Sequence, residues 1–100
     1  MDMIHGLFKV LGPKQAPRSG RHKLAGTITV DGVPASRVVA VLDRRSFERM
    51  ATTTSNHKTG KWEVVGLPER PEKALVVVAF DNTGKYNAEV ADYVSQVATV

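Results

Sequence analysis

The 100-residue chain contains no cysteine, and only 6% of its residues are aromatic. Without cysteine, the chain has no disulfide bond, no thiolate zinc site and no thiol nucleophile. It also lacks any apolar run near the roughly 18 residues that a membrane-spanning helix needs. A chain of this length buries about 60 to 65% of its unfolded surface, which supports one modest core. These absences predict a single small soluble domain with no membrane partner.

The basic excess of the chain lies at its N-terminal end. Met1–Lys23 contains five basic residues and one acidic residue, whereas Leu24–Val100 contains nine of each, so the net charge of +4 belongs to the first segment. Such an arm can neutralise phosphates, but its linker has no aromatic residue that would stack on a base. We therefore expect a neutral body with a basic arm and no nucleic-acid partner. Polar residues interrupt the first eleven positions, so no signal peptide is predicted.

Within the arm, an apolar stripe precedes a linker rich in proline, glycine and serine. The spacing i, i+3, i+4 and i+7 of four apolar residues predicts a short helix with one apolar face. A helix this short is marginal in water, so we expect an acidic partner protein to cover that face. The arm takes in residues 1–22 and the folded domain residues 23–100. The residues predicted to bind the partner are Ile4, Leu7, Phe8, Leu11, Lys14, Arg18 and Arg21.

From Lys23 onward, short alternating or continuous apolar segments separated by turn residues predict an all-β fold. About seven strands at roughly ten-residue spacing favour an antiparallel sandwich. Phe47–Ser55 is expected at an edge, Trp62 in the core, and Val38–Leu42 across the core from Leu75–Phe80. The predicted strands are Leu24–Val30, Val38–Leu42, Phe47–Ser55, Lys61–Val65, Leu75–Phe80 and one or two between Tyr86 and Val100.

Several of these turns carry a family resemblance. Gly26, the run Asp31-Gly32-Val33-Pro34-Ala35-Ser36, the positions Val39, Val41 and Asp43, and the groups Thr54-Ser55, Gly60-Lys61-Trp62 and Gly66-Leu67-Pro68 follow one another in order. This order resembles the carboxypeptidase regulatory-like, prealbumin-like domain. The resemblance covers roughly Leu24 to Phe80. It implies a seven-stranded antiparallel prealbumin-like (Ig-like) sandwich whose members mostly bind, space or brace, with no catalytic residue and no cofactor.

The segment Asp81–Asp92 looks similar to small stand-alone versions of this domain among tailed-bacteriophage structural proteins. That resemblance implies a non-enzymatic virion subunit made in the host cytoplasm and placed in the phage tail, at the tail tip or baseplate. Its partners would be other virion structural proteins, with the subunit present in multiple symmetric copies. Two alternatives stay open. One is a module that binds host-surface carbohydrate through loops around Arg44, His57 and Asn82, and the other is a capsid decoration protein.

Catalytic and metal-binding interpretations have little support in the residues. Hydroxyisourate hydrolases of related fold end in a Tyr-Arg-Gly-Ser tetrapeptide, which the segment Gln96–Val100 does not contain. His5, His22 and His57 are too widely spaced to present paired zinc ligands and are expected on the surface. Asp81–Gly84 has one carboxylate and is expected to be an ordinary turn. The charged loop from Arg44 to Arg49 is expected to form surface salt bridges of little stabilising value.

Overall fold

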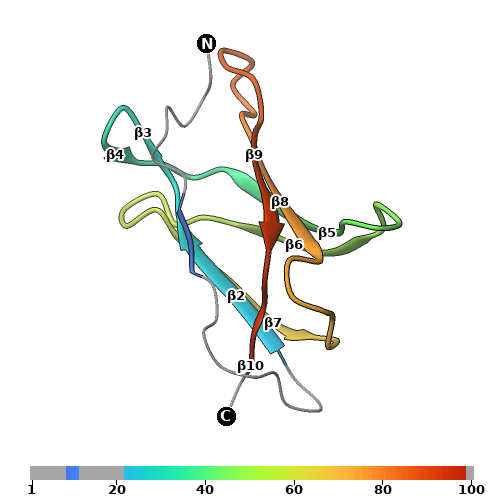
Figure 1. Cartoon of the computed structure of the whole chain (residues 1–100). Helices are drawn as coiled ribbons and strands as arrows, with labels where there is room; N and C mark the ends of the chain where they lie inside the picture. The colour runs from blue at the N-terminus through green and yellow to red at the C-terminus, as the bar shows by residue number, and fades with distance from the viewer. Residues whose placement is uncertain (1–8, 12–21, 99–100) are drawn as a thin grey trace.

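The computed structural model describes residues 9–11 and 22–98, which form ten strands and no helix (Figure 1). The all-β prediction is confirmed for these residues. The strands are β1 (Lys9–Leu11), β2 (His22–Thr27), β3 (Thr29–Val30), β4 (Val33–Pro34), β5 (Val38–Asp43), β6 (Arg49–Thr54), β7 (Lys61–Leu67), β8 (Leu75–Phe80), β9 (Glu89–Val94) and β10 (Val97–Ala98).

Eight of the strands form two antiparallel sheets, and β3 and β4 form a small hairpin. In the first, the β2 sheet, strand β2 pairs with β7 along one side and with β1 and β10 along the other. In the second, the β5 sheet, the strand order is β6-β5-β8-β9. Figure 1 shows β8 and β9 running alongside each other and β2 beside β7.

One core lies between the two sheets. The β2 sheet contributes alternate residues, because successive side chains of a strand point to opposite faces. The β5 sheet contributes the alternate residues of its two central strands. The buried cluster comprises Leu24, Ile28, Trp62, Val64 and Leu67 from the first side, and Val39, Val41, Leu75, Val77, Ala79 and Val94 from the second. Two antiparallel sheets around one core are compatible with a β-sandwich, and the core position of Trp62 is confirmed.

The two most apolar segments are neighbours in one sheet. Val38–Leu42 and Leu75–Phe80 were expected to face each other across the core, and this was wrong, because β5 and β8 pair directly with Val41 opposite Val77. An apolar run shows that a strand is covered on both sides, but the pattern does not say whether its neighbour lies beside it or across from it. Phe47–Ser55 does supply an edge strand, β6, as predicted.

Three further expectations need correction. Lys9–Leu11 form a strand opposite β2, so Leu11 does not end a helix, and residues 1–8 lie outside the described residues. The described residues form ten strands where seven were expected. Four of the ten, β1, β3, β4 and β10, are only two or three residues long, which is too short to show a side-chain period in the sequence. His57 is exposed, but His22 is fully buried, because it occupies an inward position of β2 two residues before Leu24.

Gly60 fixes the approach of the β6–β7 loop to the end of β2. Its backbone adopts φ +75°, and a Cβ atom on it would lie 2.2 Å from the carbonyl oxygen of Ile28. The same residue accepts a 2.7 Å hydrogen bond from the N–H of Ile28 and donates one of 2.7 Å to the carbonyl of Asn56. A side chain at this position therefore meets the backbone of the neighbouring strand.

The replacement Gly60→Ala is expected to lower the free energy of unfolding by about 3 kcal/mol or more, because a clash adds to the cost of the left-handed backbone. Gly32→Ala is the matched control, since Gly32 has φ +83° but nothing within 4 Å of its Cβ position. It should cost only about 1 to 2 kcal/mol. Urea unfolding of both variants measures the difference, and equal losses would contradict the close approach.

Candidate functional site

Of the seven residues predicted to bind a partner through the arm, six lie outside the described part of the chain. They are Ile4, Leu7, Phe8, Lys14, Arg18 and Arg21. Leu11 is described only as part of strand β1, where its backbone lies opposite Ala25. The candidate site is therefore built from residues of the folded domain.

An arginine and two aromatic residues gather beside the β5–β6 loop. The guanidinium of Arg44 lies 3.9 Å from the ring centroid of Tyr93. It donates to both carboxylate oxygens of Asp92, from Nε at 2.7 Å and from Nη2 at 3.3 Å. Phe47 lines the same depression as Arg44 and Asp92. We call Arg44, Phe47, Asp92 and Tyr93 the Arg44 cluster.

The ion pair sets the charge state of the cluster. Hydrogen bonding from Arg44, and secondarily from the N–H of Tyr93, lowers the pKa of Asp92 below its usual value. The hydrogen bond with Asp92 likewise raises the pKa of Arg44. Both side chains keep about two fifths of their surface exposed, so the pair adds little to stability in water. The cluster is therefore a charged, oriented pair beside apolar rings.

Both aromatic residues of the cluster are exposed and adopt left-handed backbone conformations. Phe47 has φ 63° and a 72% exposed surface, and Tyr93 has φ 55° and a 58% exposed surface. Bulky residues rarely occupy this region, and strain of this kind gathers at functional sites. The N–H of Phe47 bonds to the carbonyl of Asp43 at 2.7 Å, which holds the loop in place. The two rings are thus held at the surface by a constrained backbone.

The cluster lies at one end of an apolar sheet surface. A depression of about 340 Å³ is lined by Arg44, Phe47, Val76, Val90 and Asp92. Beyond it, the side of the β5 sheet that faces away from the core, which we call the outer face, is apolar along β5, β8 and β9. Its apolar residues are Val38, Ala40, Leu42, Val76, Val78, Phe80 and Val90, of which Ala40, Val76 and Val78 are buried and Phe80 and Val90 are exposed.

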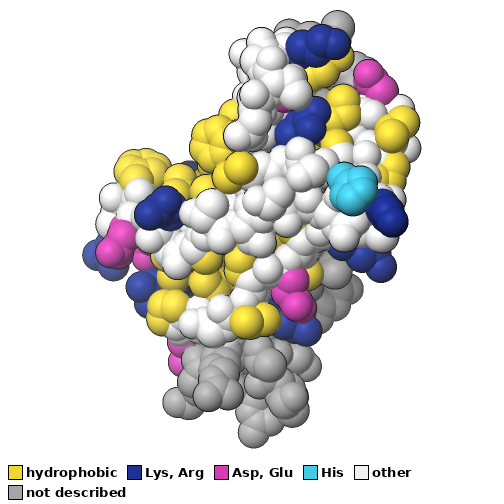
Figure 2. All heavy atoms as spheres, turned by 180° about the vertical axis from the view of Figure 1, so that it is seen from behind, with side chains coloured by type: hydrophobic (Ala, Val, Ile, Leu, Met, Phe, Trp, Pro, Cys, Tyr) yellow, Lys and Arg dark blue, Asp and Glu magenta, His cyan; other side chains and the backbone are white. Residues whose placement is uncertain are grey.

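The β5–β6 loop projects from the body on the right of Figure 1, and therefore on the left of Figure 2. Hydrophobic side chains are interleaved there with charged side chains of both signs. This mixture of exposed aromatic, arginine and aliphatic groups is typical of the centres of protein–protein interfaces.

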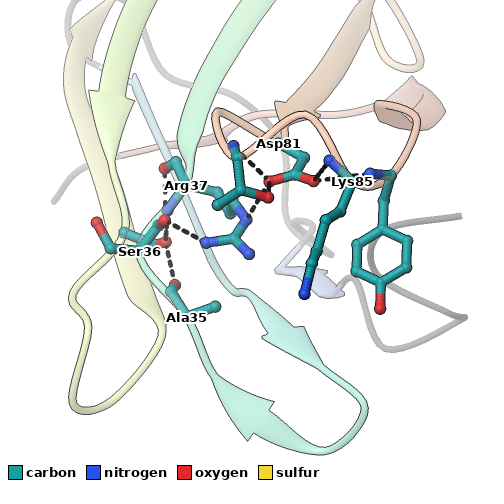
Figure 3. A network of polar contacts seen from close by, with 8 residues as sticks. Ala35, Ser36, Arg37, Asp81 and Lys85 are labelled. Atoms are coloured by element: carbon teal, nitrogen blue, oxygen red, sulfur yellow. Dashed lines mark hydrogen bonds and ion pairs between the residues drawn. The ribbon is translucent and has the colours of Figure 1, made fainter.

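A second polar network closes the turn after β8 (Figure 3). The carboxylate of Asp81 accepts hydrogen bonds from the N–H groups of Thr83, Lys85 and Tyr86 at 2.8 to 3.0 Å. It also accepts one from the Thr83 hydroxyl at 2.6 Å, and Arg37 Nε lies 3.4 Å away. The side chain is 0% exposed. Both oxygens are directed at turn backbone and Arg37, as expected for a structural turn.

These hydrogen bonds favour the charged form of Asp81. The Thr83 hydroxyl contributes most, and together with the three backbone N–H groups it holds the pKa of Asp81 far below the usual range of a carboxyl. Asp43, at the opposite end of β5, has its pKa lowered in the same direction, chiefly by the side chain of Arg70. Two ionised carboxylates therefore organise loops at the two ends of the β5 sheet.

The remaining sites are less distinctive. A wider depression of about 470 Å³ lies on the β2 sheet, lined by Ala25, Gly26, Thr27, Asn56, Thr59, Lys61, Trp62 and Glu63. No group of three or more histidine, aspartate or glutamate side chains able to hold a metal ion occurs among residues 9–11 and 22–98. The same residues contain no helix long and apolar enough to cross a membrane.

No protein-family model, no curated protein and no solved structure matches this chain.

The sequence pattern missed the Arg44 cluster as a surface. The ion pair expected in the charged loop exists for Arg44, but its partner is Asp92, 48 residues away, and no local spacing indicates it. Nothing in the local pattern distinguishes Phe47 and Tyr93 from their neighbours, because their exposure and left-handed backbone follow from the loop geometry. The one available signal was the position of Phe47 inside a charged loop.

The replacement Asp81→Asn is expected to lower the melting temperature by several degrees at neutral pH, because an amide accepts fewer of the turn's hydrogen bonds. The pKa of Asp81 is lower in the folded state than in the unfolded chain, so its stabilising effect is present above about pH 4 and is lost as the pH falls further. The difference between wild type and variant should therefore shrink as the pH falls from about 4 to about 2.

Asp31→Asn is the matched control, since Asp31 is an exposed turn residue whose φ of 52° asparagine tolerates well. It should leave the melting temperature nearly unchanged. Thermal unfolding followed by circular dichroism across this pH range measures both variants. A difference for Asp81→Asn that stays constant with pH would show that its charge is not what stabilises the turn.

Proposed function

We propose that this chain is a prealbumin-like β-sandwich that serves as a non-enzymatic structural subunit of a tailed-bacteriophage virion, in the tail tip or baseplate. The family and virion assignments rest on the sequence motifs between Gly26 and Asp92. The arm would tether the subunit to a neighbouring virion protein, and the folded domain would act as a rigid spacer or platform.

The observation that carries this proposal is the Arg44 cluster at the end of the apolar outer face. Tyrosine and arginine dominate binding energy at protein interfaces when they sit among well-packed apolar neighbours. Arg44 is already oriented by Asp92 and Tyr93, so little of its conformational freedom remains to be lost on binding. The Arg44 cluster, with the exposed Phe80 and Val90 of the outer face, would therefore provide the contact surface for another virion structural protein.

The replacement Phe47→Asn tests this surface. Asparagine tolerates the left-handed backbone, so the fold should be retained while an exposed ring is removed. We expect at least tenfold less of the variant in assembled particles, since loss of a central interface ring commonly costs this much or more. Val33→Asn is the control, because Val33 is 63% exposed on strand β4 and does not line the depression at the cluster. Equal incorporation of both variants would rule out the outer face as the contact surface.

The arm is tested by replacing Leu7 and Phe8 together by aspartate. Two charges on the predicted apolar stripe should abolish incorporation, whereas the domain should remain folded by circular dichroism. Normal incorporation of this double variant would refute the tether without bearing on the outer face.

A carbohydrate-binding module is the second candidate, and the same cluster favours it. An exposed ring beside an oriented arginine–aspartate pair presents a stacking surface together with hydrogen-bonding groups for hydroxyls. Deleting residues 1–22 separates the candidates, because glycan binding should survive the deletion and incorporation into particles should not. Mass spectrometry of gradient-purified particles then supplies the copy ratio, which distinguishes a tail-tip location from capsid decoration.

A further inference from the structure

The edges of the two sheets differ in how well they are protected against pairing with another chain. Among the described residues, β6 and β9 end the β5 sheet, and β7 ends the β2 sheet. The other side of β2 is covered by strands of two and three residues. Native proteins protect long edges with charges, bulges or short strands, because an unprotected edge is a template for another strand.

Two of the three long edges carry such protection. Strand β7 places Lys61 and Glu63 on its exposed side and adopts φ +74° at Gly66. Strand β9 contains Asp92, a register shift opposite β8, and the left-handed residue Tyr93. Charge and irregular backbone oppose the addition of a flat strand at both places.

Strand β6 lacks these features over most of its length. From Ala51 to Thr54 it pairs with β5 in continuous register, and its one register shift lies toward Arg49. Met50–Thr54 carry no charge, and three of these residues are consecutive threonines, which favour strands. Thr52 and Thr54 are exposed. This edge is therefore uncharged from Met50 to Thr54 and in continuous register from Ala51 to Thr54, with exposed side chains at Thr52 and Thr54.

We propose that β6 pairs antiparallel with β6 of a second copy of this chain, which joins two β5 sheets into one continuous sheet. A two-fold axis perpendicular to the sheet makes the strands antiparallel and keeps outer side chains opposite outer side chains. Opposite residues share a face only when the axis lies midway between the two copies of one residue, so that this residue is opposite its own copy.

An axis at Thr52 places only uncharged side chains opposite one another over Met50–Thr54 and leaves Ser55 out of the pairing. With the axis at Thr52, Thr52 lies opposite itself and Ala51 opposite Thr53, and the regular pairing ends where Met50, in the register shift, meets Thr54. An axis at Thr53 would bring in Ser55, which is buried and already bonded to the N–H of Arg37 and the carbonyl of Ala35. Thr52 lies opposite Ala40, an outer-face residue, so the two outer faces would become one surface.

Self-association of the full-length chain tests the pairing without any other virion protein. Sedimentation equilibrium at concentrations up to about 1 mM should show a monomer–dimer equilibrium for the wild type. Thr52→Lys should raise the Kd at least tenfold, because two ammonium groups would meet at the axis, where opposite residues lie about 5 Å apart. Val65→Lys adds the same charge at a 65% exposed position of β7 and should leave the Kd unchanged.

A single introduced cysteine tests the register. Because the chain has no cysteine of its own, Thr52→Cys creates one thiol whose symmetric mate would lie directly opposite it. In a glutathione redox buffer it should form the disulfide-linked dimer at least tenfold faster than Val65→Cys. Three results would each overturn the proposal: a wild type that is monomeric throughout, loss of the dimer in Val65→Lys instead of Thr52→Lys, or equal cross-linking of the two cysteine variants. None of them bears on the Arg44 cluster as a contact for another protein.

Discussion

The pairing of β5 with β8 sets which side chains face the core and which form the outer face of the β5 sheet. The two strands pair over six residues without a register shift and lie at the centre of the β5 sheet. On one side they place Val39, Val41 and Val77 in the core shared with the β2 sheet. On the other side they place Ala40 and Val78 on the outer face, where both are buried. A shift of one residue in either strand would exchange the two faces.

Ionised carboxylates hold this strand pair at both ends. Asp81 follows β8 and meets Arg37, which directly precedes β5. Asp43 ends β5 opposite Leu75, the first residue of β8, and bonds to Arg70 in the loop between β7 and β8. Each carboxylate also accepts backbone N–H groups of its own loop. Loops anchored in this way present their exposed side chains at defined positions, which a contact surface needs.

The same strand pair connects the two proposed contact regions. The Arg44 cluster lies at the Asp43 end of the β5–β8 pair, beside β9. The edge strand β6 lies along the opposite side of the β5 sheet. Pairing of β6 with a second copy would leave the cluster exposed at both ends of the joined sheet. A subunit that contacts itself at one edge and another protein at the other end suits a symmetric assembly.

Much of the fold follows from local pattern. Alternation in β2 and β7, the apolar runs of β5 and β8, and the turn residues Asp31 and Gly32 predict the strands where the structure has them, because the side-chain period of a strand is a local property. The edge position of β6 and the buried Trp62 follow in the same way. The family and virion assignments remain proposals from motifs.

The pattern of residues along the chain was enough to predict the all-β class, the position of most strands and the neutral charge of the body. The folded chain was needed to show that β5 and β8 are lateral neighbours, that His22 is buried, and that Arg44 pairs with Asp92. Each of these depends on residues that are distant along the chain. The side-chain period of a strand indicates which of its faces is covered. Which other strand covers that face depends on how the whole chain packs.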